Sequence, residues 1–157
     1  DKKLIVASGG PELEKIKQDD FTGFIIDGSP RKIFAAQLMD QAFEWYEWDK
    51  YLKIFHIDIS RKESFSRLTT RKLCGKCGRI IPYIGEFKKL EKCDKCGGKF
   101  KVRHDDHPDG IKTRLDLFEK ETMPIIEYYK KTGKKVIDIN GEQSIEKVFA
   151  DILKHLK

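Results

Sequence analysis

The stretch of residues 73–100 reads LCGKCGRIIPYIGEFKKLEKCDKCGGKF and contains every cysteine of the chain. The cysteines form two Cys-x-x-Cys pairs with fifteen residues between them: Cys74, Cys77, Cys93 and Cys96. A two-residue gap lets both thiolates of a pair bind one side of a cation, and two such pairs complete a tetrahedron. We therefore predict a structural zinc site, with two disulfides or four unrelated buried thiols as the alternative.

Glycines follow the second cysteine of each pair, at Gly78 and at Gly97 and Gly98. A tight turn at these positions needs a residue that tolerates positive φ, as glycine does. A site closed by four thiolates leaves no open coordination position. The zinc is therefore expected to hold the shape of the segment and to take no part in chemistry.

The composition is typical of a globular protein with an anionic partner. The chain has 157 residues, 39% of them hydrophobic, and a formal net charge of +6. This length fits one domain with a small insert, and the positive charge favours a nucleotide, a nucleic acid or an acidic surface as partner. We see no membrane-spanning run and no signal peptide, and cysteines that bind metal fit a reducing compartment. We expect a soluble, cytoplasmic protein.

Short apolar runs alternate with helical patterns along the rest of the chain. The apolar runs are residues 4–7, 24–26, 51–59 and 134–139, and the helical patterns are residues 11–18, 33–48, 60–71, a long stretch that opens at 104–108, and 141–155. This alternation is typical of an α/β fold, in which a parallel sheet has flanking helices and right-handed crossovers. We predict an α/β core made of residues 1–71 and 104–157, interrupted by a zinc-binding insert of residues 72–103.

Three local signals refine the helices. Ser60 followed by Glu63 is a capping box, which predicts that a helix begins there. Pro124 should kink the long helix that opens near residue 104, because proline cannot donate a backbone hydrogen bond. In residues 33–48, large apolar side chains recur at helical spacing, among them Phe34, Leu38 and Trp45.

Asp27-Gly28-Ser29-Pro30-Arg31 directly follows the apolar run 24–26. In an open parallel sheet, ligands bind beyond the carboxyl ends of the strands. Asp27 there could hold a magnesium ion through water, and Arg31 could bind a phosphate with two nitrogens. An ordinary turn followed by a surface arginine is the alternative.

Four arginines bracket the zinc segment: Arg67 and Arg71 precede it, and Arg103 and Arg114 follow it. A guanidinium group is always charged and binds phosphate oxygens in pairs, so we predict a polyphosphate clamp. Residues 67–103 contain twelve Lys or Arg against three Asp or Glu. The alternative is a solvated basic face in which the arginines serve helix propensity.

The sequence gives no support for nucleophilic catalysis. The cysteines are assigned to metal, and no serine has a recognisable His and Asp partnership. His104 and His107 flank Asp105 and Asp106, and we interpret this group as capping acids with exposed histidines in preference to a second metal site.

Five segments carry a resemblance to a known family. They read GFIIDGSPR (23–31), RLTTRKLCGKCGRIIPY (67–83), CDKCGGKF (93–100), VRHDDHPDGIKTRL (102–115) and ETMPIIEYY (121–129). Together they resemble adenylate kinase, in the form whose lid carries structural zinc, over most of the chain. The resemblance implies a P-loop kinase-like core and transfer of the terminal phosphoryl group of ATP to AMP, with Mg²⁺. ATP, AMP and ADP are the implied partners of a monomer, and we do not expect nucleic acid.

The resemblance also implies site residues. Residues 72–103 match the lid that closes over ATP. Arg31 matches the arginine that binds the AMP phosphate, and Arg67 and Arg71 match arginines at the ATP phosphates. The remaining matches are Arg103 and Arg114, for the pair that stabilises the transferring group, and Asp105 and Asp106, for the acidic pair that orders the closed lid and the magnesium shell.

Two features depart from the family. The glycine-rich loop GxxxxGK[ST] does not occur in the sequence; Gly9-Gly10-Pro11 is not continued in that way. In the family this loop would precede residue 1, so we expect the chain to be either a fragment without its N-terminal part or a derivative that has lost the loop. In both cases the core is incomplete, and we expect this chain by itself to be inactive or nearly so. Ala35 stands where the family usually has glutamine, so a preference for AMP does not follow.

Three hypotheses remain. The chain is a nucleoside monophosphate kinase, complete or truncated, or a catalytically dead relative of one. The third is a zinc-ribbon module for RNA or DNA, whose basic insert offers Tyr83, Phe87 and Phe100 for stacking on bases.

Overall fold

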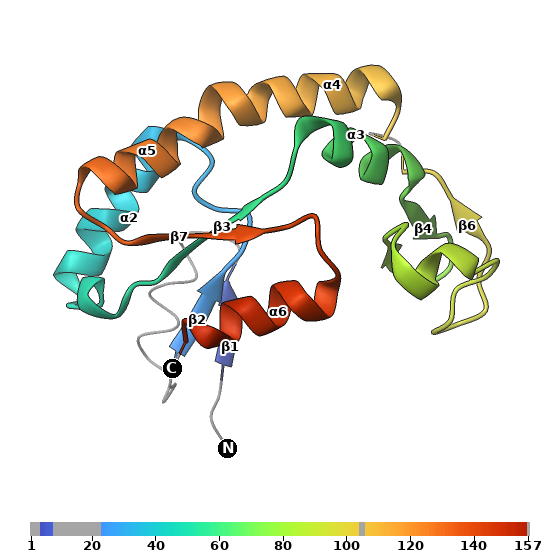
Figure 1. Ribbon diagram of the computed structural model, residues 1–157, viewed down its shortest axis with the longest axis horizontal. Helices are drawn as coiled ribbons and strands as arrows, with labels where there is room; N and C mark the ends of the chain where they lie inside the picture. Colours follow the sequence, from blue (N-terminus) through green and yellow to red (C-terminus); the bar gives the residue numbers. More distant parts are fainter. Residues whose placement is uncertain (1–3, 8–22, 104–105, 157) are drawn as a thin grey trace. The chain divides into compact units, whose positions relative to one another are not determined.

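The computed structural model (Figure 1) describes residues 4–7, 23–103 and 106–156. The chain divides into two compact units. Unit 1 is made of Asp1–Lys53 and Phe118–Lys135, and unit 2 of Ile54–Leu117 and Val136–Lys157. The helix predicted for residues 11–18 lies outside the described residues.

Unit 1 contains two parallel strands and two main helices. Strand β1 (Leu4–Ala7) pairs in parallel with β2 (Gly23–Ile26), so that Val6 lies opposite Ile25. Helix α2 (Ile33–Trp45) packs against α5 (Met123–Lys131), and the short 3₁₀ helix η1 (Asp49–Tyr51) follows α2. The core is centred on Phe43, which is buried against Phe24, Ile26, Met39, Trp48 and Leu52. These contacts fix β2, and with it the loop that begins at Asp27.

Helix α2 is present as predicted, but its buried face is not the stripe of large apolar residues. Phe34, Leu38 and Trp45 are 70%, 49% and 82% exposed, whereas Ala36, Asp40 and Phe43 are buried. Asp40 can be buried because it has partners. The Tyr128 hydroxyl donates to its Oδ2 at 2.8 Å, and the Lys134 Nζ lies 3.2 Å from its Oδ1. The hydrogen bond to Asp40 also raises the pKa of Tyr128.

The irregularity predicted at Pro124 takes the form of a π-helical segment. The segment η3 (Phe118–Thr122) immediately precedes α5, and Pro124 lies in the first turn of α5. Proline has no N–H, and its ring clashes with the carbonyl four residues earlier in a regular α-helix. The wider i→i+5 turns of a π-helix relieve that clash.

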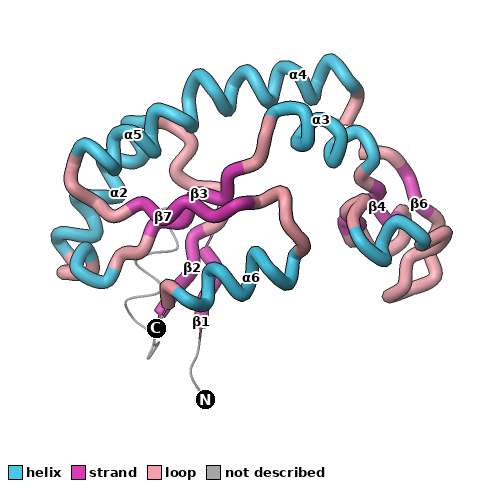
Figure 2. Tube along the Cα trace, in the orientation of Figure 1, coloured by secondary structure: helices cyan, strands magenta, loops and turns pink. Residues whose placement is uncertain are grey.

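Unit 2 contains a second parallel pair of strands with three helices (Figure 2). Strand β3 (Ile54–Asp58) pairs in parallel with β7 (Val136–Asn140), in a register that places Asp58 opposite Asn140. Helix α6 (Ile145–Lys154) contacts β7, and α3 (Arg61–Thr70) packs against α4 (Pro108–Leu117). The α/β prediction of parallel strands flanked by helices is thus confirmed. Within the described residues the parallel strands form two pairs, one in each unit.

Side-chain caps begin two of the helices in unit 2. The Ser60 hydroxyl accepts a hydrogen bond from the Glu63 N–H at 3.3 Å, which is the predicted cap of α3. The Glu63 carboxylate binds Arg67 at 2.7 Å. Ser144, for which no cap was predicted, caps α6 in the same way, with its hydroxyl accepting from the Lys147 N–H. None of the helices described is both long enough and apolar enough to cross a bilayer.

Candidate functional site

The zinc segment forms a small antiparallel sheet in unit 2. Strand β4 (Lys72–Cys74) lies between β5 (Ile80–Ile81) and β6 (Phe100–Lys101), and a 3₁₀ helix, η2 (Gly85–Lys89), follows β5. The buried apolar residues of this segment are Ile81 and two of the cysteines, Cys74 and Cys93. Such a small core cannot by itself hold the segment together.

Each cysteine pair forms the same turn. The Gly78 N–H donates to the Cys74 carbonyl at 3.1 Å, and the Gly97 N–H donates to the Cys93 carbonyl at 2.7 Å. Gly78 and Gly97 have φ of +72° and +67°, which confirms the predicted need for glycine. Gly98 is required for a different reason, because a Cβ there would lie 2.8 Å from the Cys74 Sγ.

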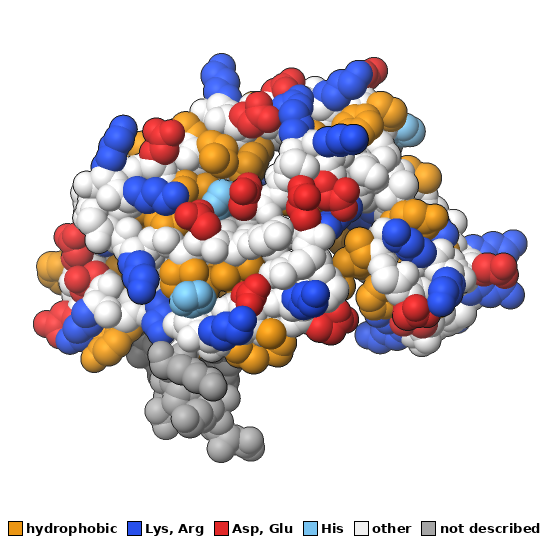
Figure 3. All heavy atoms as spheres, in the orientation of Figure 1, with side chains coloured by type: hydrophobic (Ala, Val, Ile, Leu, Met, Phe, Trp, Pro, Cys, Tyr) orange, Lys and Arg blue, Asp and Glu red, His pale blue; other side chains and the backbone are white. Residues whose placement is uncertain are grey.

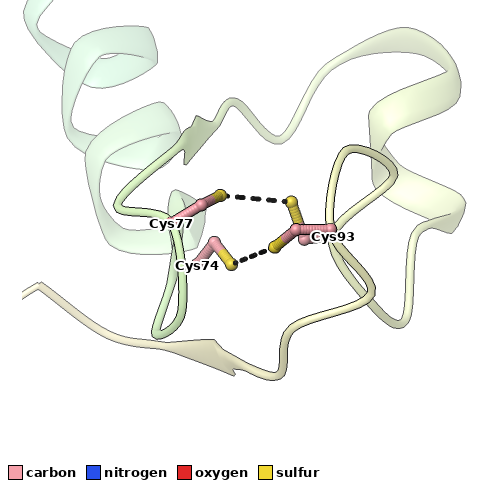
Figure 4. Close-up of side chains that lie close together, drawn as sticks. Cys74, Cys77 and Cys93 are labelled. Carbon is pink, nitrogen blue, oxygen red and sulfur yellow. Dashed lines mark hydrogen bonds between the residues drawn. The ribbon is translucent and has the colours of Figure 1, made fainter.

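The four thiols face one another (Figure 4). The Cys74 and Cys96 sulfurs are 3.5 Å apart, the Cys77 and Cys93 sulfurs are 3.7 Å apart, and all four lie within 4.8 Å of one another. Four thiolates around zinc have sulfurs about 3.8 Å apart, whereas a disulfide needs about 2.0 Å. The arrangement fits zinc and not two disulfides. Within the described residues this is the only group of three or more side chains arranged to hold a metal ion.

The thiols of this cluster differ in acidity. The Cys77 backbone N–H holds the pKa of the Cys74 thiol down to about 6, against the effect of burial. The Gly98 N–H favours the Cys96 thiolate, but the neighbouring Cys77 and Cys74 sulfurs outweigh it and raise the pKa of Cys96 to about 12. Four sulfurs this close cannot all ionise without a cation, and a bound zinc ion would supply that cation.

A buried carboxylate joins the two borders of the zinc segment. Arg71, directly after α3, donates from Nε to Asp106 Oδ2 at 2.7 Å and from Nη2 to Oδ1. Arg114, on α4, donates from Nη1 to the same Oδ1 at 3.1 Å. The Asp106 side chain is fully buried and binds arginines, whereas the sequence suggested an acid that caps the following helix. The sequence contains no signal for this burial.

Charge keeps Asp106 ionised. Burial alone would raise its pKa, but the hydrogen bonds and charge of Arg71, with the charges of Arg114 and Arg103, lower it below the ordinary value. Three of the four predicted arginines therefore act on one carboxylate. This group, Arg71, Arg103, Asp106 and Arg114, is called the arginine cluster below.

Arg67 belongs to a different network. It donates from Nε to Glu63 Oε1 at 2.7 Å and from Nη1 to the Gly141 carbonyl at 3.0 Å. The Gly141 N–H in turn donates to the Asp58 carbonyl at 2.7 Å, so Arg67 connects α3 to the carboxyl ends of β3 and β7. The pairing of Arg67 with Glu63 could have been predicted, because the two residues are four apart on one helix. Nothing in the sequence indicated the hydrogen bond from Arg67 to Gly141.

The remaining predicted site residues lie elsewhere. Asp27 and Arg31 are in unit 1, both exposed, and the Arg31 Nε donates to the Gly28 carbonyl at 2.7 Å. Gly28 has a φ of +74°, and this turn folds the arginine back over the loop after β2. Asp105 lies outside the described residues.

The surface of the zinc segment is basic, and lysine side chains lie over two of its aromatic rings. Exposed lysines occur at 76, 88, 89, 92, 95, 99 and 101. The Lys88 Nζ lies 5.5 Å from the centre of the Tyr83 ring, and the Lys72 Nζ lies 5.2 Å from that of Phe100. On the face drawn in Figure 3, Lys and Arg side chains are interspersed with Asp and Glu. Tyr83 is 40% exposed and Phe87 and Phe100 are half-buried, so one of the three rings is open to solvent for stacking.

Gly98 provides a direct test of the metal site. We expect Gly98→Ala to lower zinc affinity about 10- to 100-fold, because the added methyl displaces a ligand sulfur. Competition with a chromogenic chelator measures this. Gly75→Ala is the matched control, since the nearest atom to its Cβ would be 3.4 Å away. Equal zinc affinity in the two variants would contradict the close-approach explanation.

Comparison with known proteins gives a consistent result. The family model described as adenylate kinase matches residues 11–134. An adenylate kinase of Petrotoga mobilis is 34% identical over 146 residues, which cover 92% of this chain and 67% of that protein. Adenylate kinases of Lactobacillus delbrueckii subsp. bulgaricus and Methanocella arvoryzae are 41% and 37% identical, and in both cases the match covers 88% of this chain and 64% of the relative. The chain thus spans about two thirds of the length of these curated relatives.

Proposed function

The chain belongs to the adenylate kinase family, and from this premise we propose that it serves the transfer of the terminal phosphoryl group of ATP to AMP as a nucleoside monophosphate kinase. The observation that carries the proposal is the arginine cluster at the borders of the zinc segment. Phosphoryl transfer requires positioning and positive charge around the migrating group and does not require a protein nucleophile. The arginine cluster could supply this positive charge, which supports the proposal.

Individual roles follow from the family resemblance together with these contacts. In the proposed assignment Arg31 binds the AMP phosphate, Arg67 and Arg71 serve ATP, and Arg103 and Arg114 stabilise the transferring group. Asp27 holds magnesium through water, and magnesium would neutralise charge on the ATP phosphates. Asp105 remains part of the proposal as a second acid beside the lid.

Residues 72–103 are proposed to move as a lid. The four cysteines gather around one metal position, which allows the segment to close as a rigid body. Closure of a lid excludes water, which suppresses hydrolysis of ATP and strengthens the interaction of each arginine with phosphate.

Binding, and not turnover, is the first measurement, because the 157 residues contain no GxxxxGK[ST] loop to cradle the phosphates. We expect a bisubstrate dinucleotide, two adenosines joined by a polyphosphate, to bind with micromolar affinity. We expect Arg31→Ala to weaken this binding about tenfold or more, by loss of a charge-assisted phosphate contact. Lys32→Ala, which removes an exposed neighbouring cation, is the control and should change binding little.

A short oligonucleotide titrated at matched salt separates the alternative. Steeply salt-dependent oligonucleotide binding that is unaffected by Arg31→Ala, without dinucleotide binding, would favour the zinc-ribbon hypothesis over the kinase.

A further inference from the structure

The Asp106 carboxylate has no access to solvent and both of its oxygens are in use. Arg71 occupies one edge of the carboxylate with two nitrogens, and Arg114 donates to one of the same oxygens. A magnesium ion in such a site keeps several water molecules in a nearly ideal octahedron. A fully buried carboxylate held by two guanidinium groups leaves no room for that shell. In the described part of the chain, no set of three or more metal-ligating side chains includes Asp106.

The charges of the cluster do not cancel. Asp106 contributes one negative charge, and Arg71, Arg103 and Arg114 contribute three positive charges that all act on it. Without the carboxylate, guanidinium groups held this close would repel one another and separate.

The carboxylate also lies between the elements that carry the arginines. Arg71 comes directly after α3, at the start of the zinc segment, and Asp106 follows the end of that segment. Arg114 belongs to α4, which packs against α3. The side chains of Arg71 and Arg114 remain 16% and 39% exposed, so both reach the solvent-accessible surface beside the buried carboxylate. Asp106 thus determines where these donors point.

We propose that Asp106 is a positioning residue, whose buried carboxylate holds the guanidinium groups of Arg71 and Arg114 in place for a polyphosphate and does not bind magnesium. This inference deepens the proposed kinase function and rests on it for the identity of the ligand.

The test is the sign of the effect of Asp106→Asn on ATP binding, measured by calorimetry with and without magnesium. Loss of a negative charge beside an anion site should tighten binding if charge alone acts. If Asp106 positions Arg71, loss of the paired hydrogen bonds between the two residues should weaken ATP binding about tenfold or more, by the same factor with and without magnesium. Asp109→Asn is the control, since this acid is 98% exposed on the first turn of α4 and its removal should leave binding unchanged or slightly tighter.

Each outcome decides between explanations. Weakening only in the presence of magnesium would overturn the proposal in favour of a magnesium ligand, and unchanged or tighter binding would overturn it outright. Inorganic tripolyphosphate separates the proposal from the kinase function. If the wild type binds tripolyphosphate but no nucleotide, and Asp106→Asn weakens tripolyphosphate binding, positioning stands and the kinase proposal fails. If the wild type binds neither anion, both fail.

A second variant covers the case in which Asp106→Asn does not fold. Arg71→Lys keeps the positive charge, but an ammonium group cannot donate in parallel to both carboxylate oxygens. We expect Arg71→Lys to weaken ATP and tripolyphosphate binding both with and without magnesium. Where both single variants fold, the double variant with Asp106→Asn should lose less binding free energy than the sum of the two single losses. Wild-type affinity in Arg71→Lys would overturn the proposal.

Discussion

Replacement of Cys74 by serine, or removal of the zinc with a chelator, is expected to unfold residues 72–103 while the helices of both units remain. The buried apolar side chains of this segment are Ile81 and two metal ligands, Cys74 and Cys93, so little else holds the sheet of β4, β5 and β6. Zinc bound to comparable small sites contributes an apparent free energy of about 10–16 kcal/mol at pH 7. The metal therefore supplies most of the stability of the segment.

Limited proteolysis at the exposed lysines of the segment, together with far-ultraviolet circular dichroism, measures this effect. Cys74→Ser should be cut rapidly and should lose zinc, with little change in helix signal. Lys76→Ser, in the same turn between Cys74 and Cys77, is the matched control and should keep its zinc. A Cys74→Ser protein that retains stoichiometric zinc and protection from the protease would refute the prediction.

Asp106→Ala is expected to destabilise unit 2 by about 3–5 kcal/mol, because it leaves Arg71 largely buried without a counter-charge. The effect should depend on pH. The pKa of Asp106 is lower in the folded protein than its ordinary value of about 3.9. Its contribution to stability is thus fully present above that ordinary value and is lost as the pH falls through the folded value.

Urea unfolding of the wild type and the variant between neutral and strongly acidic pH tests both statements. The difference in stability between them should be constant from neutral pH to about pH 5 and should shrink below pH 4. Asp109→Ala, at an exposed acid, provides the comparison and should unfold like the wild type. A difference that is small at neutral pH, or that grows in acid, would show that the Arg71 pair does not stabilise the fold.

Local chemistry made the metal segment predictable. The Cys-x-x-Cys spacing, the glycines after each pair and the Ser60 cap depend on neighbours only a few residues away. The structure contains the predicted cysteine pairs and glycine turns, although Gly98 is required by close packing and not by its φ. Of the predicted capping box only the Ser60 hydroxyl bond is formed, because the Glu63 carboxylate binds Arg67 and the Ser60 N–H donates to Glu142. The parallel strands were also accessible, because buried strands have a recognisable apolar pattern.

The features that could not be predicted depend on partners distant in the sequence. Asp40 can lie on the buried face of α2 because its carboxylate accepts a hydrogen bond from Tyr128 and pairs with Lys134. Both partners come about ninety residues later in the chain. From the sequence, Asp106 is predicted to cap a helix. In the structure it binds Arg71, which lies 35 residues earlier in the chain. In both cases an ionisable side chain is buried, and only the folded chain shows the groups that compensate its charge.

The two cysteine turns are not equally accessible. Cys74 and Cys93 are buried, Cys96 is intermediate, and Cys77 is exposed. The cysteine cluster therefore has an outward side, at the turn that carries Cys77. With zinc bound, we expect a competing chelator to approach the metal from the Cys77 side and exchange to begin there.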